Sequence, residues 1–121
     1  MSKCVMVVDD SSTIRKFVMF ALRAQGLTVV TAQDGMDALE KMAQTPVDLV
    51  VTDLNMPKLD GFGLVRAIRS DRDYADLPVI ILSSLSDERD KAEGFRIGAN
   101  AYLVKPFDQK RIQYEISKYI S

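Results

Sequence analysis

The chain has 121 residues, with 16 Lys and Arg against 17 Asp and Glu, so its formal net charge is −1. This length predicts a single globular domain over residues 1–121, and the balanced charge does not favour direct binding to nucleic acid. The chain has one cysteine and no histidine, which excludes an internal disulfide, a Ser-His-Asp triad and a His-ligated metal. No apolar run is long enough for a transmembrane helix, and we expect a cytoplasmic protein.

The chain opens with a strand, a helix and a second strand. The apolar residues 4–8 predict a buried strand, and Ser11 or Ser12 can cap the helix that follows. Gly26 is expected to end that helix, and residues 27–31 predict the next strand. The inward-facing residues of the helix recur at helical spacing: Ile14, Phe17, Val18, Ala21 and Leu22.

Two further strand–helix alternations occupy the middle of the chain. Asp34 can cap a second helix, and the run 47–53 predicts a buried strand that ends on Asp53. Asp60 begins a third helix, and residues 77–82 predict the fourth strand. The expected inner residues of these two helices are Ala38, Leu39, Met42 and Ala43 for the second, and Leu64, Val65 and Ile68 for the third.

The fourth predicted helix, over residues 87–97, is the weakest of the set. Gly94 in its interior costs about 1 kcal/mol relative to alanine. Its expected apolar stripe is thin, with only Ala92, Phe95 and Ala99. We therefore expect this helix to be the least stable and the most able to move.

The chain closes with one more strand and helix. Residues 101–104 predict a fifth strand, and Ile112, Ile116 and Ile120 give the last helix a buried edge. Strands alternating with helices imply a parallel sheet covered on both faces. The prediction is an α/β fold, a doubly wound (βα)5 flavodoxin-like sheet with strand order 2-1-3-4-5.

This topology brings several polar side chains to one edge of the sheet. Asp9 and Asp10 follow the first strand, Asp53 ends the third, Ser83 follows the fourth and Lys105 follows the fifth. Taken singly, each has an ordinary interpretation as a turn acid, a helix cap or a solvated lysine. Together they predict a site in which Mg²⁺ and Lys105 balance the three carboxylates.

Such a site permits one kind of chemistry in particular. A carboxylate held beside a dication and a lysine can attack a phosphoryl group and become an aspartyl phosphate. Mg²⁺, the Lys105 ammonium and the Ser83 hydroxyl could each take one oxygen of the transferring group. The small Ser84 would leave the nucleophile accessible.

The sequence resembles the receiver domain of two-component response regulators, most closely the stand-alone chemotaxis type, over essentially its whole length. The resemblance rests on Asp9-Asp10, on the D-x-x-M-P-x-x-D-G run that starts at Asp53, on Ser83 and Tyr102, and on Lys105-Pro106-Phe107. The combination at this spacing is highly specific, although no single piece is.

The resemblance implies a role for each matching residue. Asp53 is expected to accept the phosphoryl group, with Lys105 binding the phosphate. Asp10 and Asp53 would ligate Mg²⁺ directly, Asn55 through its backbone carbonyl and Asp9 through a metal-bound water. Ser83 and Tyr102 match the switch residues, although Tyr102 could also be plain core packing. Lys105-Pro106 resembles a cis-peptide position of the family.

Asn55 and Leu85 match family positions that modulate dephosphorylation. Because Leu85 is apolar, it cannot orient an attacking water, and we expect no help to hydrolysis from that side. A Leu85→Glu variant is therefore expected to change the lifetime of the phosphorylated form.

The implied function is a phosphorylation-driven binding switch of a chemotaxis-type phosphorelay, which performs only its own phosphotransfer and slow autodephosphorylation. A sensor histidine kinase or phosphotransfer protein would be the phosphodonor, since the chain has no histidine. A downstream protein would bind the face of the fourth helix, fifth strand and fifth helix. The expected residues of that face are Lys91, Phe95, Tyr102, Lys110, Gln113 and Tyr114.

Two other functions fit less well. A phosphatase with an aspartyl intermediate would need a general acid two residues after Asp53, where Asn55 stands. A flavin- or nucleotide-binding module would need a phosphate-binding loop after the first strand, where Asp9 and Asp10 would repel a phosphate. Met1 and the end just past the last helix favour a stand-alone protein over an excised receiver.

Overall fold

A computed structural model describes residues 3–84, 88–105 and 107–120. Within these residues, parallel strands form one sheet in the order β2-β1-β3-β4-β5, which confirms the predicted doubly wound α/β topology. The strands are β1 (Cys4–Val8), β2 (Thr28–Ala32), β3 (Leu49–Thr52), β4 (Val79–Ser83) and β5 (Ala101–Val104). The helices are α1 (Ser12–Ala24), α2 (Gly35–Gln44), α3 (Gly61–Ser70), α4 (Glu88–Arg96) and α5 (Gln109–Ser117).

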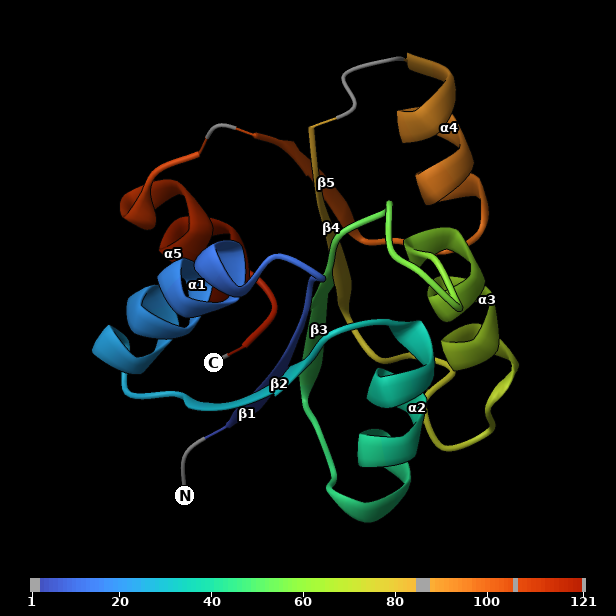
Figure 1. Ribbon diagram of the computed structural model, residues 1–121, viewed down its shortest axis with the longest axis horizontal. Coiled ribbons are helices and arrows are strands. Elements are labelled where there is room, and N and C mark those ends of the chain that lie inside the picture. The colour runs from blue at the N-terminus through green and yellow to red at the C-terminus, as the bar shows by residue number, and fades with distance from the viewer. Residues whose placement is uncertain (1–2, 85–87, 106, 121) are drawn as a thin grey trace.

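The sheet lies between two layers of helices (Figure 1). Helices α1 and α5 cover one face, and α2, α3 and α4 cover the other. Each face has its own apolar core: Val7, Leu22, Val51 and Ile112 belong to one, and Met6, Val50, Leu64 and Ile81 to the other. All four residues of β3 are buried, as expected of a central parallel strand. Among the described helices, none is both long and apolar enough to cross a membrane.

Several helices begin at the capping residues that the sequence predicts. Ser11, Asp34 and Asp60 each accept a hydrogen bond from a backbone N–H of the first turn, as predicted. Gly26, with φ of 84°, ends α1, and the N–H of Leu27 bonds back to Leu22 O. This helix-ending bond occupies Leu27, so β2 begins one residue later than predicted.

The predicted start of the fourth strand is also too early. The prediction placed it at Leu77, but β4 begins at Val79 and extends to Ser83. Pro78 has no N–H to donate to a neighbouring strand, although its carbonyl accepts from Val50 N at 3.0 Å. The pairing through backbone N–H groups therefore starts after the proline.

The predicted inner stripe of α4 is wrong at two of its three positions. Ala92 and Phe95 are exposed, whereas Ala99, just after the helix, is buried. Among the described residues of α4, Gly94 is the buried one. A Cβ at Gly94 would lie 3.0 Å from Ile81 Cδ1 and 3.4 Å from the Tyr102 ring, so the glycine lets α4 approach the sheet closely.

Candidate functional site

The strand register brings the predicted site residues to one edge of the sheet. Val8, at the end of β1, lies opposite Thr52, at the end of β3, and Asp53 N donates to Val8 O at 2.9 Å. On the other side, Lys105 N donates to Ser83 O at 2.7 Å. Asp9, Asp53, Ser83 and Lys105 therefore lie at the same carboxyl edge, where doubly wound proteins bind ligands.

Three carboxylates and one lysine converge at this edge. Asp9, Asp10 and Asp53 each offer one oxygen, and these oxygens lie within 4.8 Å of one another. Lys105 Nζ lies 3.3 Å from Asp9 Oδ2 and 3.6 Å from Asp53 Oδ1. Asp9 and Asp53 are buried, while Asp10 is exposed. One ammonium against three carboxylates leaves excess negative charge on the site.

Asp9 is held by more partners than the sequence suggested. Its Oδ1 accepts a hydrogen bond from Ser11 N at 2.9 Å, and its backbone carbonyl accepts from the Arg15 guanidinium. Ser11 was expected only as a helix cap, and it also caps α1 through Ile14 N. Arg15 carries no sequence signal for this role, because nothing in the spacing shows that its side chain turns back to Asp9.

The environment of Asp53 disfavours its charged form. Burial is the largest cause that raises the pKa of its carboxyl; the Lys105 ammonium opposes this, while the carboxylates of Asp9 and Asp10 add to it. The carbonyl oxygen of Asp53 accepts a hydrogen bond from Thr52 Oγ1 at 2.8 Å. Asp53 is therefore an acid whose ionisation calls for a compensating cation.

The three acids are a donor set that suits Mg²⁺. Mg²⁺ prefers hard oxygen ligands, and it usually keeps several waters while binding one or two carboxylates. Asp10 is open to solvent and the two buried acids stand beside it, so the donor set suits a dication that enters from outside. Within the described residues, no buried side-chain polar atom lacks a hydrogen-bond partner.

The remaining predicted residues differ in their burial. Ser83 is fully buried at the end of β4. Tyr102 is half-buried in β5, opposite Ile81, and packs against the core beneath α4. Asn55 is exposed in the loop after β3. Leu85 and Pro106 lie outside the described residues.

The expected output face is only partly assembled as predicted. Phe95 and Tyr114 are exposed, at 51% and 62%, and Lys118 Nζ lies 4.6 Å from the centre of the Tyr114 ring. Gln113, however, is directed to the opposite side: its Nε2 donates to Ala21 O of α1 at 2.7 Å. Helix contact between α1 and α5 uses this amide, so Gln113 does not belong to the face.

Comparison with known proteins identifies the family. The chain matches the model of the response regulator receiver domain over residues 5–117. The chain therefore belongs to the response regulator receiver domain family, whose members are signalling switches that interact with kinases and downstream targets.

Several relatives and solved structures are similar over nearly the whole chain. Protein PilG of Pseudomonas aeruginosa is 40% identical over 116 residues, which cover 96% of this chain and 86% of PilG. A probable transcriptional regulator, ycf27 of Guillardia theta, is 43% identical over 112 residues, covering 93% of this chain but only 43% of its own length. The structure of the chemotaxis protein CheY4 of Vibrio cholerae aligns with a TM-score of 0.94 at 34% identity, covering 99% of this chain and 100% of that one.

Proposed function

We propose that the chain is a phosphorylation-dependent switch that accepts a phosphoryl group on Asp53. The supporting observation is the convergence of three carboxylates and Lys105 at one edge of the sheet. A carboxylate oxygen of Asp53 forms a bond to phosphorus, and the bond from phosphorus to the donor histidine nitrogen breaks. The imidazole leaves with that electron pair and takes a proton, so that the donor returns as a neutral histidine.

Each neighbouring residue has a part in this transfer. Lys105 neutralises one phosphoryl oxygen, and the Ser83 hydroxyl binds another after transfer. Asp10, Asp53 and the Asn55 carbonyl would hold Mg²⁺ directly, with Asp9 acting through water. When bound, Mg²⁺ supplies charge neutralisation of the transferring group.

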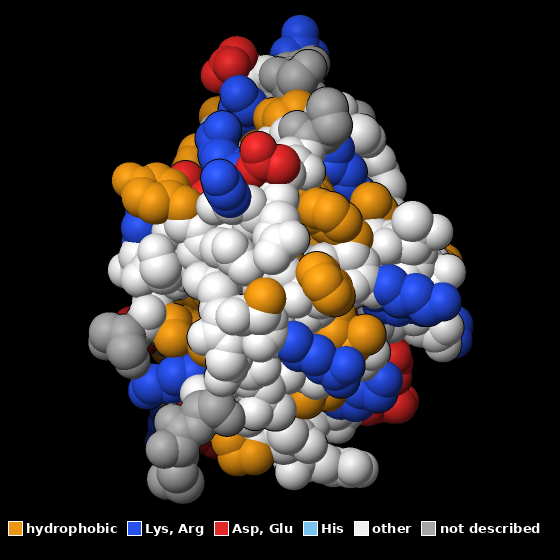
Figure 2. All heavy atoms as spheres, turned by 90° about the vertical axis from the view of Figure 1, so that its left-hand side faces the viewer, with side chains coloured by type: hydrophobic (Ala, Val, Ile, Leu, Met, Phe, Trp, Pro, Cys, Tyr) orange, Lys and Arg blue, Asp and Glu red, His pale blue; other side chains and the backbone are white. Residues whose placement is uncertain are grey.

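A histidine-free chain needs its phosphohistidine from another protein, here a sensor histidine kinase or a phosphotransfer protein. An apolar pocket of about 420 Å³ opens beside Lys105 and is lined by Thr13, Ile14, Phe17 and Phe107. The rings of Phe17 and Phe107 have centroids 6.3 Å apart. Figure 2 looks onto this side of the molecule, where hydrophobic groups lie among Lys and Arg side chains. This surface suits contact with the donor protein.

The output is a change in partner binding on the face of α4, β5 and α5. Tyr102 belongs to β5, and its ring would lie 3.4 Å from a Cβ placed at Gly94 of α4, so a movement of the Tyr102 ring would be felt by α4. Phe95, Lys110 and Tyr114 supply exposed contact groups on this face. A partner that binds the two states with different affinity is all that the switch requires.

We further propose that residues 1–121 act as a single receiver domain in the cytoplasm, without a separate substrate. The ycf27 relative is more than twice as long as the segment that it shares with this chain, and PilG is only slightly longer than its shared segment. The likeness to the chemotaxis protein CheY4, all of which is covered, favours a role in a chemotaxis-type phosphorelay.

Phosphate labelling tests the assignment of Asp53. The chain is incubated with a radiolabelled acyl phosphate and Mg²⁺, or with a phosphorylated histidine phosphotransfer protein. Asp53→Asn is expected to abolish labelling, while Asp48→Asn, at the opposite end of β3, retains it. Undiminished labelling of Asp53→Asn would overturn the proposal.

A further inference from the structure

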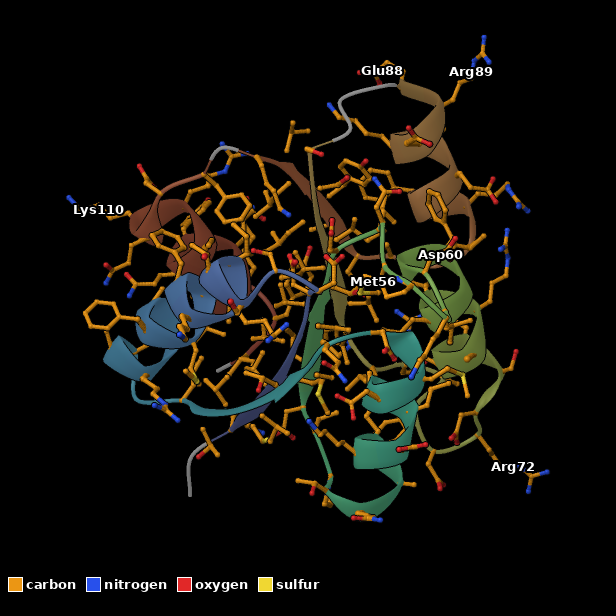
Figure 3. The ribbon with its side chains drawn as sticks, viewed as in Figure 1. Met56, Asp60, Arg72, Glu88, Arg89 and Lys110 are labelled. Carbon is orange, nitrogen blue, oxygen red and sulfur yellow. The ribbon has the colours of Figure 1, made fainter. Side chains whose placement is uncertain are left out.

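The loop between β3 and α3 contains a strained turn close to the site. Leu59 N donates to Pro57 O at 2.8 Å, and the residue between them, Lys58, has a φ of 66°. This is the pattern of a γ-turn with a positive central φ, a rare and strained conformation for a residue with a side chain. Such a turn persists only where the surrounding structure holds it. Figure 3 labels Met56 and Asp60, the residues on either side of this turn.

The first residue of α2 supplies one such constraint. Gly35 is buried, and its N–H donates to Leu59 O at 3.0 Å. A Cβ at Gly35 would lie 2.6 Å from Leu59 O and 2.9 Å from Leu59 Cβ, too close for any other residue without a backbone shift. The Asp34 side chain fixes this end of α2, since it accepts from Asp37 N at 2.8 Å. The start of α2 therefore rests directly on the backbone of the turn.

The C-terminal end of the same loop, at Gly61, packs against the backbone of Asp53 and Leu54. Gly61 N donates to Leu54 O at 2.9 Å, and a Cβ at Gly61 would collide with the carbonyl oxygen of Asp53. Asp60, the residue before it, caps α3 through Gly63 N at 2.8 Å. Only a short segment, which includes Asn55, separates Asp53 from the turn at Lys58. A shift of the turn is thus transmitted to the groups at both ends of this segment.

We propose that Gly35 is a positioning residue for the site, because its contact with Leu59 holds the loop that carries Asp53 and the Asn55 carbonyl. This role rests on the proposed function, since it assumes that these two residues bind Mg²⁺. Gly35 touches neither the metal nor the phosphoryl group. It acts through the backbone of Leu59 and so ties α2 to the phosphorylation site.

The test compares two glycine substitutions that both approach Leu59. Gly35→Ala would place a methyl group against the Leu59 backbone, 2.6 Å from its carbonyl oxygen. Gly63→Ala would approach side-chain atoms instead: Leu59 Cδ1 at 2.6 Å, Leu59 Cγ at 3.3 Å and Asp60 Oδ1 at 3.4 Å. Mg²⁺ affinity is measured by calorimetry on the whole chain, and urea unfolding verifies that each variant is folded. We expect Gly35→Ala to weaken Mg²⁺ binding by about 10-fold or more, as supporting residues of metal sites do, and Gly63→Ala to stay within about two-fold. Equal Mg²⁺ affinity of Gly35→Ala and the unmodified chain would overturn the role, as would an equal loss in both variants.

A second measurement uses the unmodified chain, so it does not depend on whether a variant folds. Amide hydrogen exchange of the unmodified chain is followed by NMR with and without saturating Mg²⁺. Exchange at Gly35 is expected to slow, while Gly26, whose N–H bonds to Arg23 O far from the loop in sequence, serves as the reference. If Mg²⁺ binds but slows exchange at Gly35 no more than at Gly26, the positioning role alone is overturned. Failure of the unmodified chain to bind Mg²⁺ would overturn the proposed function and this role together.

Discussion

At the scale of single residues, Asp53 combines burial with a concentration of negative charge. Burial raises the pKa of its carboxyl above the ordinary aspartate value, and Lys105 offsets this only in part. A folded-state pKa above the unfolded one means that the folded chain binds the proton more tightly. The free energy of unfolding therefore falls as pH rises from the unfolded pKa through the folded one, and ionised Asp53 costs stability at neutral pH.

This sign leads to a testable difference between the unmodified chain and Asp53→Asn. Without divalent cations at pH 7, the variant is expected to be more stable, with a melting temperature a few degrees higher, because it removes the buried charge. The difference should shrink as pH falls through the folded-state pKa towards about 4, the ordinary pKa of aspartate, and be absent below it, where Asp53 is protonated in both states. Thermal unfolding followed by circular dichroism in EDTA across this range measures it. A less stable variant at pH 7 would contradict the argument.

At the scale of elements, Arg69 joins segments that lie apart in the chain. From α3, its guanidinium donates to Gly98 O at 2.7 Å, to Leu77 O at 2.6 Å and to Asn100 Oδ1 at 3.0 Å. Asn100 Oδ1 in turn accepts from Val79 N, at the start of β4. The side chain thus fixes the loop before β4 and the loop before β5. Nothing in the sequence pattern distinguished it from a surface arginine.

Replacing Arg69 with alanine is expected to destabilise the chain by about 2–4 kcal/mol, because several backbone carbonyls lose a charged donor at once. Arg72 is a matched control: it follows the same helix but is exposed, and Figure 3 shows it pointing away from the molecule. Arg72→Ala should change stability by less than about 0.5 kcal/mol. Urea unfolding of both variants measures the difference, and similar losses would refute the role of Arg69.

Helix α4 remains the element that we expect to open first. Among its described residues Gly94 is the buried one. In its Lys91–Glu88 ion pair, at 3.6 Å, the Glu88 side chain is exposed and the Lys91 side chain is partly exposed. Exposed pairs contribute little to stability. The pair that joins it to α3, between Arg66 and Glu93 at 2.8 Å, is exposed as well.

Hydrogen exchange of the unphosphorylated chain checks this expectation. The amides of α4 should exchange faster than those of α1 and α3, by about one order of magnitude or more, because opening α4 exposes little apolar surface. The buried central strand β3 provides the slow reference. Protection of α4 equal to that of β3 would exclude α4 as the mobile element.

At the scale of the whole molecule, the site links distant parts of the chain, so its ligand should stabilise the entire fold. A cation that binds only the folded state adds about 2.7 kcal/mol when its concentration is 100 times its dissociation constant. We expect Mg²⁺ to raise the melting temperature of the unmodified chain. The effect should be much smaller for Asp10→Asn, which removes the exposed acid of the cluster. A similar rise in both proteins would indicate general salt stabilisation.

The sequence by itself determined the fold class and the strand ends that form the site. Buried parallel strands appear as apolar runs and helix starts as capping residues, and both signals are local. The residues at the ends of the strands follow from topology alone, which is why Asp9, Asp53, Ser83 and Lys105 could be predicted to share one edge.

Only the tertiary structure decided how neighbouring elements meet. It buried Gly94 rather than Phe95 because the contact with Ile81 and Tyr102 requires close approach, which no periodicity encodes. It turned Gln113 towards α1, and it placed Gly35 against Leu59. These contacts join residues far apart in the chain, and their partners are set by packing distances rather than by local pattern.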